Sequence, residues 1–140
     1  MAQAATPLAV VGAHRTGQPL HPELAELGAL VTSVAWTAPC YRLFALADAE
    51  TQRAGLVRVT AGGTSIEVEV HRLPLTAYGT LLLRLPSPLG IGNIDLIDGR
   101  QVLGCLCESY AVAQAIDITR FGSWPAYLSH TRHTREDYPP

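Results

Sequence analysis

Hydrophobic and polar positions recur with different periods along the chain, and each period predicts one kind of element. The apolar run PLAVVGA at residues 7–13 predicts a buried first strand, and residues 14–19 predict a loop after it. Pro22 near its start and Gly28 after its end predict a short helix over residues 21–27. Segments rich in β-branched and aliphatic residues then predict two strands, at residues 30–37 and 41–46.

The middle of the chain predicts a hairpin with one polar face. Residues 56–60 and 65–71 flank a turn that contains two glycines, and the sequence IEVEV alternates apolar and acidic positions. Alternate residues of a strand point to opposite faces, so Glu67 and Glu69 share one face. We expect that face to be solvated.

The remainder of the chain predicts short helices and a second hairpin. Residues 76–85 predict a helix that Pro86 ends, and residues 89–92 predict an extended segment. Residues 94–97 and 101–107 predict strands around an Asp-Gly turn, in which glycine tolerates a positive φ. Two helical pieces and a loose polar tail are predicted at residues 109–115, 123–128 and 130–140.

Length and composition favour one folded domain that binds small molecules or proteins. The chain has 140 residues, of which 48% are hydrophobic and 16% are charged, so burial outweighs solvation. Its net charge of −2 gives no basic surface for nucleic acid or an anionic membrane. No apolar run approaches the ~20 residues of a membrane span, and the N-terminus lacks a secretory signal pattern. We therefore expect a cytoplasmic location.

The types of basic and metal-ligating residue exclude several kinds of chemistry. All ten basic residues are Arg, so Schiff-base chemistry, a P-loop Lys and a Ser-Ser-Lys amidase triad are excluded. The spacing of Cys40, Cys105 and Cys107 fits neither a disulfide framework nor metal-binding knuckles, so we expect reduced cysteines. The histidines show no metal-ligand spacing. No metal or other cofactor is expected.

Three stretches carry a resemblance to a known family. They are VVGAHRTGQPLHPELAELGA near the start, TAPCYRLFAL, and PLGIGNIDLIDGRQVLGCLCESYAVAQAIDITRFGSWPAYL near the end. In this order and spacing they resemble the C-terminal domain of allophanate hydrolase, over most of the chain. The resemblance implies one free-standing domain at residues 1–129. It also implies an α+β fold, with a small mixed, barrel-like β-sheet and short helices similar to the gamma-glutamyl cyclotransferases.

The resemblance implies a link to urea and allophanate breakdown and leaves three functions open. The first is decarboxylation of N-carboxycarbamate or a related small carboxylate, in which some family members are implicated. Alternatively, it is a non-catalytic module that binds a separately encoded amidase or forms a homodimer. A cyclotransferase-like activity is the third hypothesis, and the absence of a Glu from residues 88–92 counts against it.

His14 is the candidate catalytic residue, because a carbamate loses carbon dioxide once its nitrogen is protonated. Imidazole has an ordinary pKa of ~6.5 and can donate a proton and recover it near neutrality. Its neighbours Gly12, Ala13 and Arg15 are candidate substrate-binding residues in the same loop. The structural alternative is that His14 only stabilises the loop and that Arg15 is solvated.

The remaining candidates lie near strand ends. Tyr41 and Arg42 are adjacent and point to opposite faces, so only one can face a ligand; we favour Tyr41 inward and Arg42 in an ion pair. Glu108 is either an acid–base residue or the cap of the following helix. A last segment either packs closely or offers N–H groups to a carboxylate; it comprises Leu89, Gly90, Ile91 and Gly92.

Overall fold

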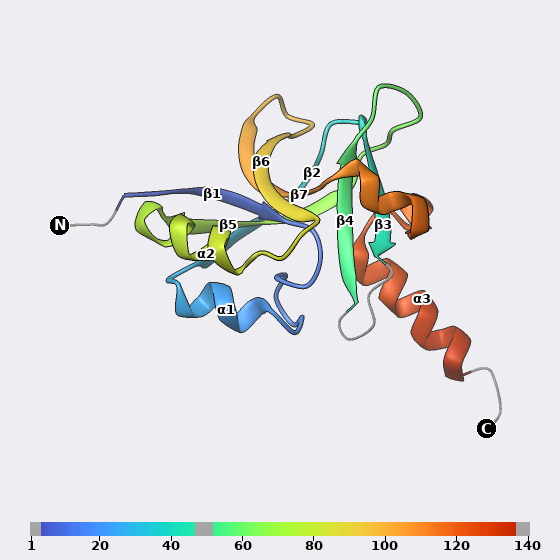
Figure 1. Cartoon of the computed structure of the whole chain (residues 1–140), viewed down its shortest axis with the longest axis horizontal. Helices are drawn as coiled ribbons and strands as arrows, with labels where there is room; N and C mark the ends of the chain where they lie inside the picture. The colour runs from blue at the N-terminus through green and yellow to red at the C-terminus, as the bar shows by residue number, and fades with distance from the viewer. Residues whose placement is uncertain (1–3, 47–51, 137–140) are drawn as a thin grey trace.

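Two β-sheets and three α-helices make up the computed structural model, which describes residues 4–46 and 52–136 (Figure 1). The strands are β1 (Ala5–Val10), β2 (Leu30–Trp36), β3 (Tyr41–Leu46), β4 (Arg53–Arg58), β5 (Glu67–Pro74), β6 (Leu89–Asp95), β7 (Gln101–Cys107) and β8 (Ile116–Asp117). The α-helices are α1 (His21–Glu26), α2 (Tyr78–Arg84) and α3 (Trp124–Glu136). Short 3-10 turns complete the order, namely η1 (Leu75–Ala77), η2 (Ser109–Gln114) and η3 (Thr119–Phe121).

The larger sheet is mixed, as the family resemblance implies. Its strand order is β2-β5-β1-β7-β6, with β1 at the centre, antiparallel to β5 and parallel to β7. The smaller sheet has the order β4-β3-β8. A single bridge between Thr37 and Leu96 connects the segment after β2 to the end of β6.

The core lies on both faces of the larger sheet, because alternate residues of its strands point to opposite sides. Leu8 and Val10 of β1 pack with Leu24 of α1 and Leu81 of α2, so both helices cover one face. On the other face, Ala9 belongs to the main cluster shared with the smaller sheet and α3. This arrangement fixes the end of β1 between the helices and the smaller sheet.

The hairpin predicted from residues 56–60 and 65–71 is not formed. Strand β4 pairs with β3, whereas β5 pairs with β1 and β2. The intervening loop explains the difference: Thr64 bridges to Tyr41, and a methyl group at Gly63 would lie 2.7 Å from the backbone of Cys40. This close approach carries the chain past β3 and into the other sheet.

Glu67 and Glu69 are consequently not on a solvated face, which corrects the expectation from IEVEV. Glu69 is only 7% exposed, because Thr16 in the loop after β1 covers it and donates two hydrogen bonds to its carboxylate. Glu67 is partly buried and forms an ion pair with Arg15. A period of two showed that these residues share a face but could not show which segment covers it.

Two further elements differ from the prediction. Strand β6 runs without interruption over Leu89–Asp95, so residues 89–92 are paired with β7 and do not form an anion-binding concavity. Helix α3 continues to Glu136, seven residues into the segment that the sequence predicted to be a loose tail. Residues 137–140 of that predicted tail lie outside the described part of the chain.

The cysteines are reduced and mostly buried. Cys105 and Cys107 are buried, Cys40 is partly buried, and all three are free thiols. Burial raises the pKa of Cys105 to about 12, which makes its thiolate inaccessible near neutrality. Within the described residues, no helix has the length and apolar character required to cross a membrane.

Candidate functional site

A pocket lies where the loop after β1 meets the two short helices and the beginnings of β4 and β6. Its lining includes Gly12, Ala13 and His14 from the loop, Glu23 from α1 and Leu89 from β6. The rest of the lining comes from Val10, Val11, Leu20, Arg53, Ala54, Arg84, Leu85, Pro86 and Cys105. Four of the sequence-predicted site residues, Gly12, Ala13, His14 and Leu89, thus come together in one pocket.

The loop is held in place by close packing and a series of backbone hydrogen bonds. A methyl group at Gly12 would lie 2.6 Å from the Cβ of Ala54, so only glycine allows the loop to approach β4 this closely. The Arg15 N–H donates to the Gly12 carbonyl at 2.9 Å, and the Leu20 N–H donates to the Ala13 carbonyl at 2.9 Å. These bonds leave His14 at a defined position in the pocket wall.

The imidazole of His14 lies beside the carboxylate of a residue that the sequence analysis did not select. Its Nε2 atom lies 3.5 Å from Oε2 of Glu23, and the His14 side chain is 8% exposed. Burial lowers the pKa of His14, and the Glu23 carboxylate opposes this effect only in part. His14 is therefore neutral at pH 7 in the ligand-free protein, with a carboxylate positioned to stabilise its protonated form.

Glu23 has a signal in the sequence, although an ambiguous one. An acidic residue in the first turn of a helix complements the helix dipole, and this role by itself would account for Glu23. The loop between β1 and α1 turns back on itself, which brings Glu23 beside His14 nine positions earlier in the sequence. Sequence spacing alone could not show this contact.

Two arginines that the sequence analysis did not single out add positive charge to the pocket wall. Arg53 begins β4 and Arg84 ends α2, and both contribute to the lining. A guanidinium group is planar and presents paired N–H donors that match the geometry of a carboxylate. The pocket therefore combines a titratable imidazole with groups suited to a small anion.

Arg15 does not line this pocket, although it neighbours His14 in the sequence. Its Nη2 atom lies 2.7 Å from Oε1 of Glu67, and Arg15 is only 6% exposed. This position differs from both earlier expectations for Arg15, which were substrate binding and exposure to solvent. The residue is neither solvated nor directed at the pocket, but connects the loop to β5.

Tyr41 and Arg42 point in opposite directions, and Arg42 is ion-paired as predicted, but Tyr41 points into the core and not into the pocket. Tyr41 is fully buried in the main core and its hydroxyl oxygen accepts a hydrogen bond from the Asp95 N–H at 2.9 Å. Arg42 Nε donates to Asp117 at 2.9 Å. Neither residue belongs to the lining of the pocket.

The other predicted residues also lie outside the pocket. Gly90, Ile91 and Gly92 belong to the paired part of β6 and do not contribute to the lining. Glu108 is exposed and occupies the N-cap position of η2, but its side chain makes no capping hydrogen bond. Its backbone N–H instead donates to the Pro88 carbonyl at 2.9 Å.

The fold and the pocket together define a class of protein, namely small α+β domains of the gamma-glutamyl cyclotransferase-like fold. An AIG2-like protein from Mus musculus has this architecture with a TM-score of 0.62 over 79% of this chain and 82% of its own. At 16% identity, the likeness concerns the fold alone. The fold implied by the sequence resemblance is thereby confirmed.

The chain belongs to the allophanate hydrolase C-terminal domain family, whose model matches residues 6–129. The urea amidolyase of Saccharomyces cerevisiae is 38% identical over 125 residues, which cover 86% of this chain and 7% of that protein. This chain therefore spans less than a tenth of the length of that curated relative.

Two solved structures extend the comparison. Allophanate hydrolase from Kluyveromyces lactis is 37% identical with a TM-score of 0.88, over 91% of this chain and 22% of that one. A uropathogenic E. coli-specific protein is 36% identical with a TM-score of 0.84, over 91% of this chain and 98% of that one. The domain thus matches a part of one solved protein and nearly the whole of another.

Proposed function

We propose that this domain acts in urea or allophanate breakdown by binding a small dicarboxylate in the His14 pocket and decarboxylating it. N-carboxycarbamate or a related carbamate is the substrate class. The observation that carries the proposal is the pairing of buried His14 with Glu23 in a pocket that Arg53 and Arg84 also line. Family membership, and relatives named urea amidolyase and allophanate hydrolase, support the choice of substrate.

The chemical step needs one proton at the substrate nitrogen. The imidazolium of His14 donates that proton to the nitrogen of N-carboxycarbamate, and the carbon–nitrogen bond to one carboxylate then breaks. The electron pair of this bond stays on nitrogen, carbon dioxide leaves, and carbamate is the other product. Neutral His14 recovers a proton from solvent before the next turnover.

Binding of a dianion prepares His14 for this role. Burial keeps the ligand-free imidazole neutral, but a negatively charged substrate beside it favours the protonated form. Glu23 favours that form too, from 3.5 Å. The proton is therefore taken up when substrate is bound, and the guanidinium groups of Arg53 and Arg84 in the pocket lining would pair with the substrate's carboxylates.

Carbon dioxide release tests the catalytic proposal. An allophanate amidase supplies N-carboxycarbamate continuously, and carbon dioxide is followed with and without this chain. We expect the native protein and the His130→Ala control to accelerate release equally, since His130 is exposed on α3 and does not line the pocket. We expect His14→Ala to give only the uncatalysed rate. Equal release by all variants and by buffer would refute catalysis.

A second candidate function, assembly, is favoured by the exposed edge of the larger sheet. Strand β2 lies at that edge and carries the exposed apolar residues Leu30, Val31, Val34 and Trp36. An unprotected apolar edge strand pairs readily with another chain, and a charge on it prevents such pairing. If β2 mediates assembly, Val34→Lys will abolish the oligomer or the amidase complex seen by light scattering. A monomer that recovers no amidase would count against this function.

A further inference from the structure

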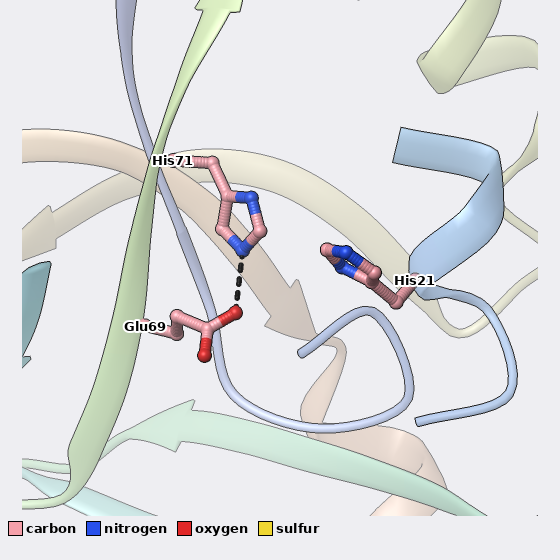
Figure 2. A group of neighbouring side chains, drawn as sticks. All are labelled: His21, Glu69 and His71. Atoms are coloured by element: carbon pink, nitrogen blue, oxygen red, sulfur yellow. Dashed lines mark hydrogen bonds and ion pairs between the residues drawn. The ribbon is translucent and has the colours of Figure 1, made fainter. Parts of the chain in front are cut away.

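A second cluster of side chains lies beside the pocket, where α1 begins next to β5. His21 is the first residue of α1, whereas Glu69 and His71 are two residues apart on β5 and share one face of it (Figure 2). One potential ligand atom from each of the three lies within 4.8 Å of the others. Of the three, only His21 is more than slightly exposed, since Glu69 is 7% and His71 0% exposed.

We propose that His21, Glu69 and His71 bind a divalent transition-metal ion such as Zn²⁺. Two imidazoles and one carboxylate form a donor set typical of zinc sites that keep a fourth position for water. The three side chains converge from two elements, as Figure 2 shows, with the imidazole of His21 turned toward the ring of His71. The site does not depend on the proposed decarboxylase function.

The hydrogen bonds around the cluster orient the ligands before a metal arrives. Nδ1 of His21 lies 3.3 Å from the His14 carbonyl oxygen, which can only accept, so this bond places the proton on Nδ1. The lone pair of Nε2 is then available to a metal. A ligating histidine commonly donates its other ring N–H to a carbonyl in this way.

Glu69 is held by the loop that precedes α1. Its Oε1 atom accepts hydrogen bonds from the Thr16 N–H at 2.8 Å and from the Thr16 hydroxyl at 2.9 Å. These donors hold Oε1 next to the imidazole of His71, and metal-ligating carboxylates are commonly held by such outer hydrogen bonds.

His71 has a ring nitrogen that the described residues leave unsatisfied. Its Nε2 atom lies 2.7 Å from Oε1 of Glu69, but its buried Nδ1 has no hydrogen-bond partner among the described residues. Either the imidazole coordinates a metal through Nε2, with the proton moving to Nδ1, or it coordinates through Nδ1 directly. In a tetrahedral site with bonds of about 2.1 Å the ligand atoms are ~3.4 Å apart. The three atoms now lie within 4.8 Å of one another, so binding needs approaches of about 1 Å.

A metal at this position would join the first residue of α1 to β5. The loop that carries His14 lies between β1 and α1. The ion would therefore fix the end of this loop where α1 begins. The sequence analysis expected no metal, because spacing along the chain does not show that a helix start meets a strand 48 residues later.

Calorimetric titration of the full chain with Zn²⁺ tests the proposal, after treatment with a chelator and its removal. The titration compares the native protein with His21→Ala, Glu69→Gln and the control His130→Ala. We expect one Zn²⁺ per chain for the native protein and the control. We expect at least about 100-fold weaker binding for the other two, beyond the ~10–100-fold losses seen when outer hydrogen-bond partners are removed.

Circular dichroism of each variant confirms that the fold is retained, and half-exposed His21 gives the substitution least able to disturb it. Substitution of Zn²⁺ by Co²⁺ provides an independent readout, because tetrahedral Co²⁺ absorbs strongly in the visible range. The proposal is overturned if the native chain binds no stoichiometric Zn²⁺. It is equally overturned if folded His21→Ala and Glu69→Gln bind as tightly as the control.

Discussion

Nε2 of His14 lies 3.5 Å from Oε2 of Glu23, across a loop that returns the chain from the end of β1 to the start of α1. Burial and Glu23 act on the pKa of His14 in opposite directions, and burial prevails. The pair therefore sets how readily the pocket takes up a proton. It links the packing of the loop to the chemistry proposed for it.

Replacement of Glu23 by Gln will lower the pKa of His14 further. The substitution removes the negative charge that favours the imidazolium and leaves burial unopposed. An NMR titration that follows the His14 imidazole will show a lower midpoint in Glu23→Gln than in the native protein. An unchanged or higher midpoint would mean that Glu23 does not act on His14.

The stability of the domain will fall when the pH is lowered from 7.5 to 5.5. The pKa of His14 is below its unfolded value of 6.5, so the unfolded chain binds more protons in this range and stability rises with pH. The pKa of His71 is also lowered, by burial, and adds to the same effect. Burial by itself would raise the pKa of Glu69, but hydrogen bonds from Thr16 outweigh this effect and lower the pKa. Protonation of Glu69 below about pH 4.5 therefore removes further stability.

The share of His14 in this pH dependence is separable. His14→Gln removes the titrating group, so the free energy of unfolding measured in guanidinium chloride will differ less between pH 7.5 and 5.5 than in the native protein. The exposed control His130→Gln will keep the native difference. The same difference in the free energy of unfolding in all three proteins would contradict a depressed pKa at His14.

Gly12→Ala will destabilise the domain by about 1–3 kcal/mol, because the new methyl group overlaps the Cβ of Ala54 at 2.6 Å. Gly79→Ala is the matched control. A methyl group at Gly79, in α2, meets nothing within 4 Å, and alanine is favoured over glycine in a helix by up to ~1 kcal/mol. Chemical denaturation will show opposite signs for the two substitutions. A neutral Gly12→Ala would show that the loop does not pack as described.

Arg15→Ala will cost stability without weakening ligand binding. The substitution breaks the 2.7 Å ion pair with Glu67 in a partly buried setting, which is worth about 1–3 kcal/mol. Arg100→Ala, which breaks an exposed pair with Asp98, will cost only ~0–1 kcal/mol. Unfolding experiments measure both. A loss of affinity for malonate, a stable mimic of the proposed dicarboxylate substrate, with stability unchanged in Arg15→Ala, would instead place Arg15 in the pocket.

Local patterns predicted most elements but not how distant ones meet. The Asp-Gly turn does join β6 to β7, and the glycine after α1 has the positive φ that ends the helix. Strand pairing was the main error, because the passage of Gly63 against Cys40 is a tertiary contact that no local period encodes. The burial of Glu69 follows from that same pairing.

The candidate site divides in the same manner. Gly12, Ala13 and His14 are adjacent in sequence, and their loop could be identified from the strand that precedes it. Glu23, Arg53 and Arg84 join them only through the fold. The local sequence of Glu23 indicates a helix start but no contact with His14, and that of the two arginines indicates no site at all. The family resemblance therefore identified the loop but not the residues of other elements that line the pocket around it.

Calorimetric titration with malonate, a stable mimic of N-carboxycarbamate, tests the central claim most directly. The account predicts saturable binding of one malonate by the native protein and by His130→Ala. It predicts strongly weakened binding by His14→Ala, with the fold retained. Absence of binding to the native protein, or equal binding by all three, would contradict a dicarboxylate pocket at His14.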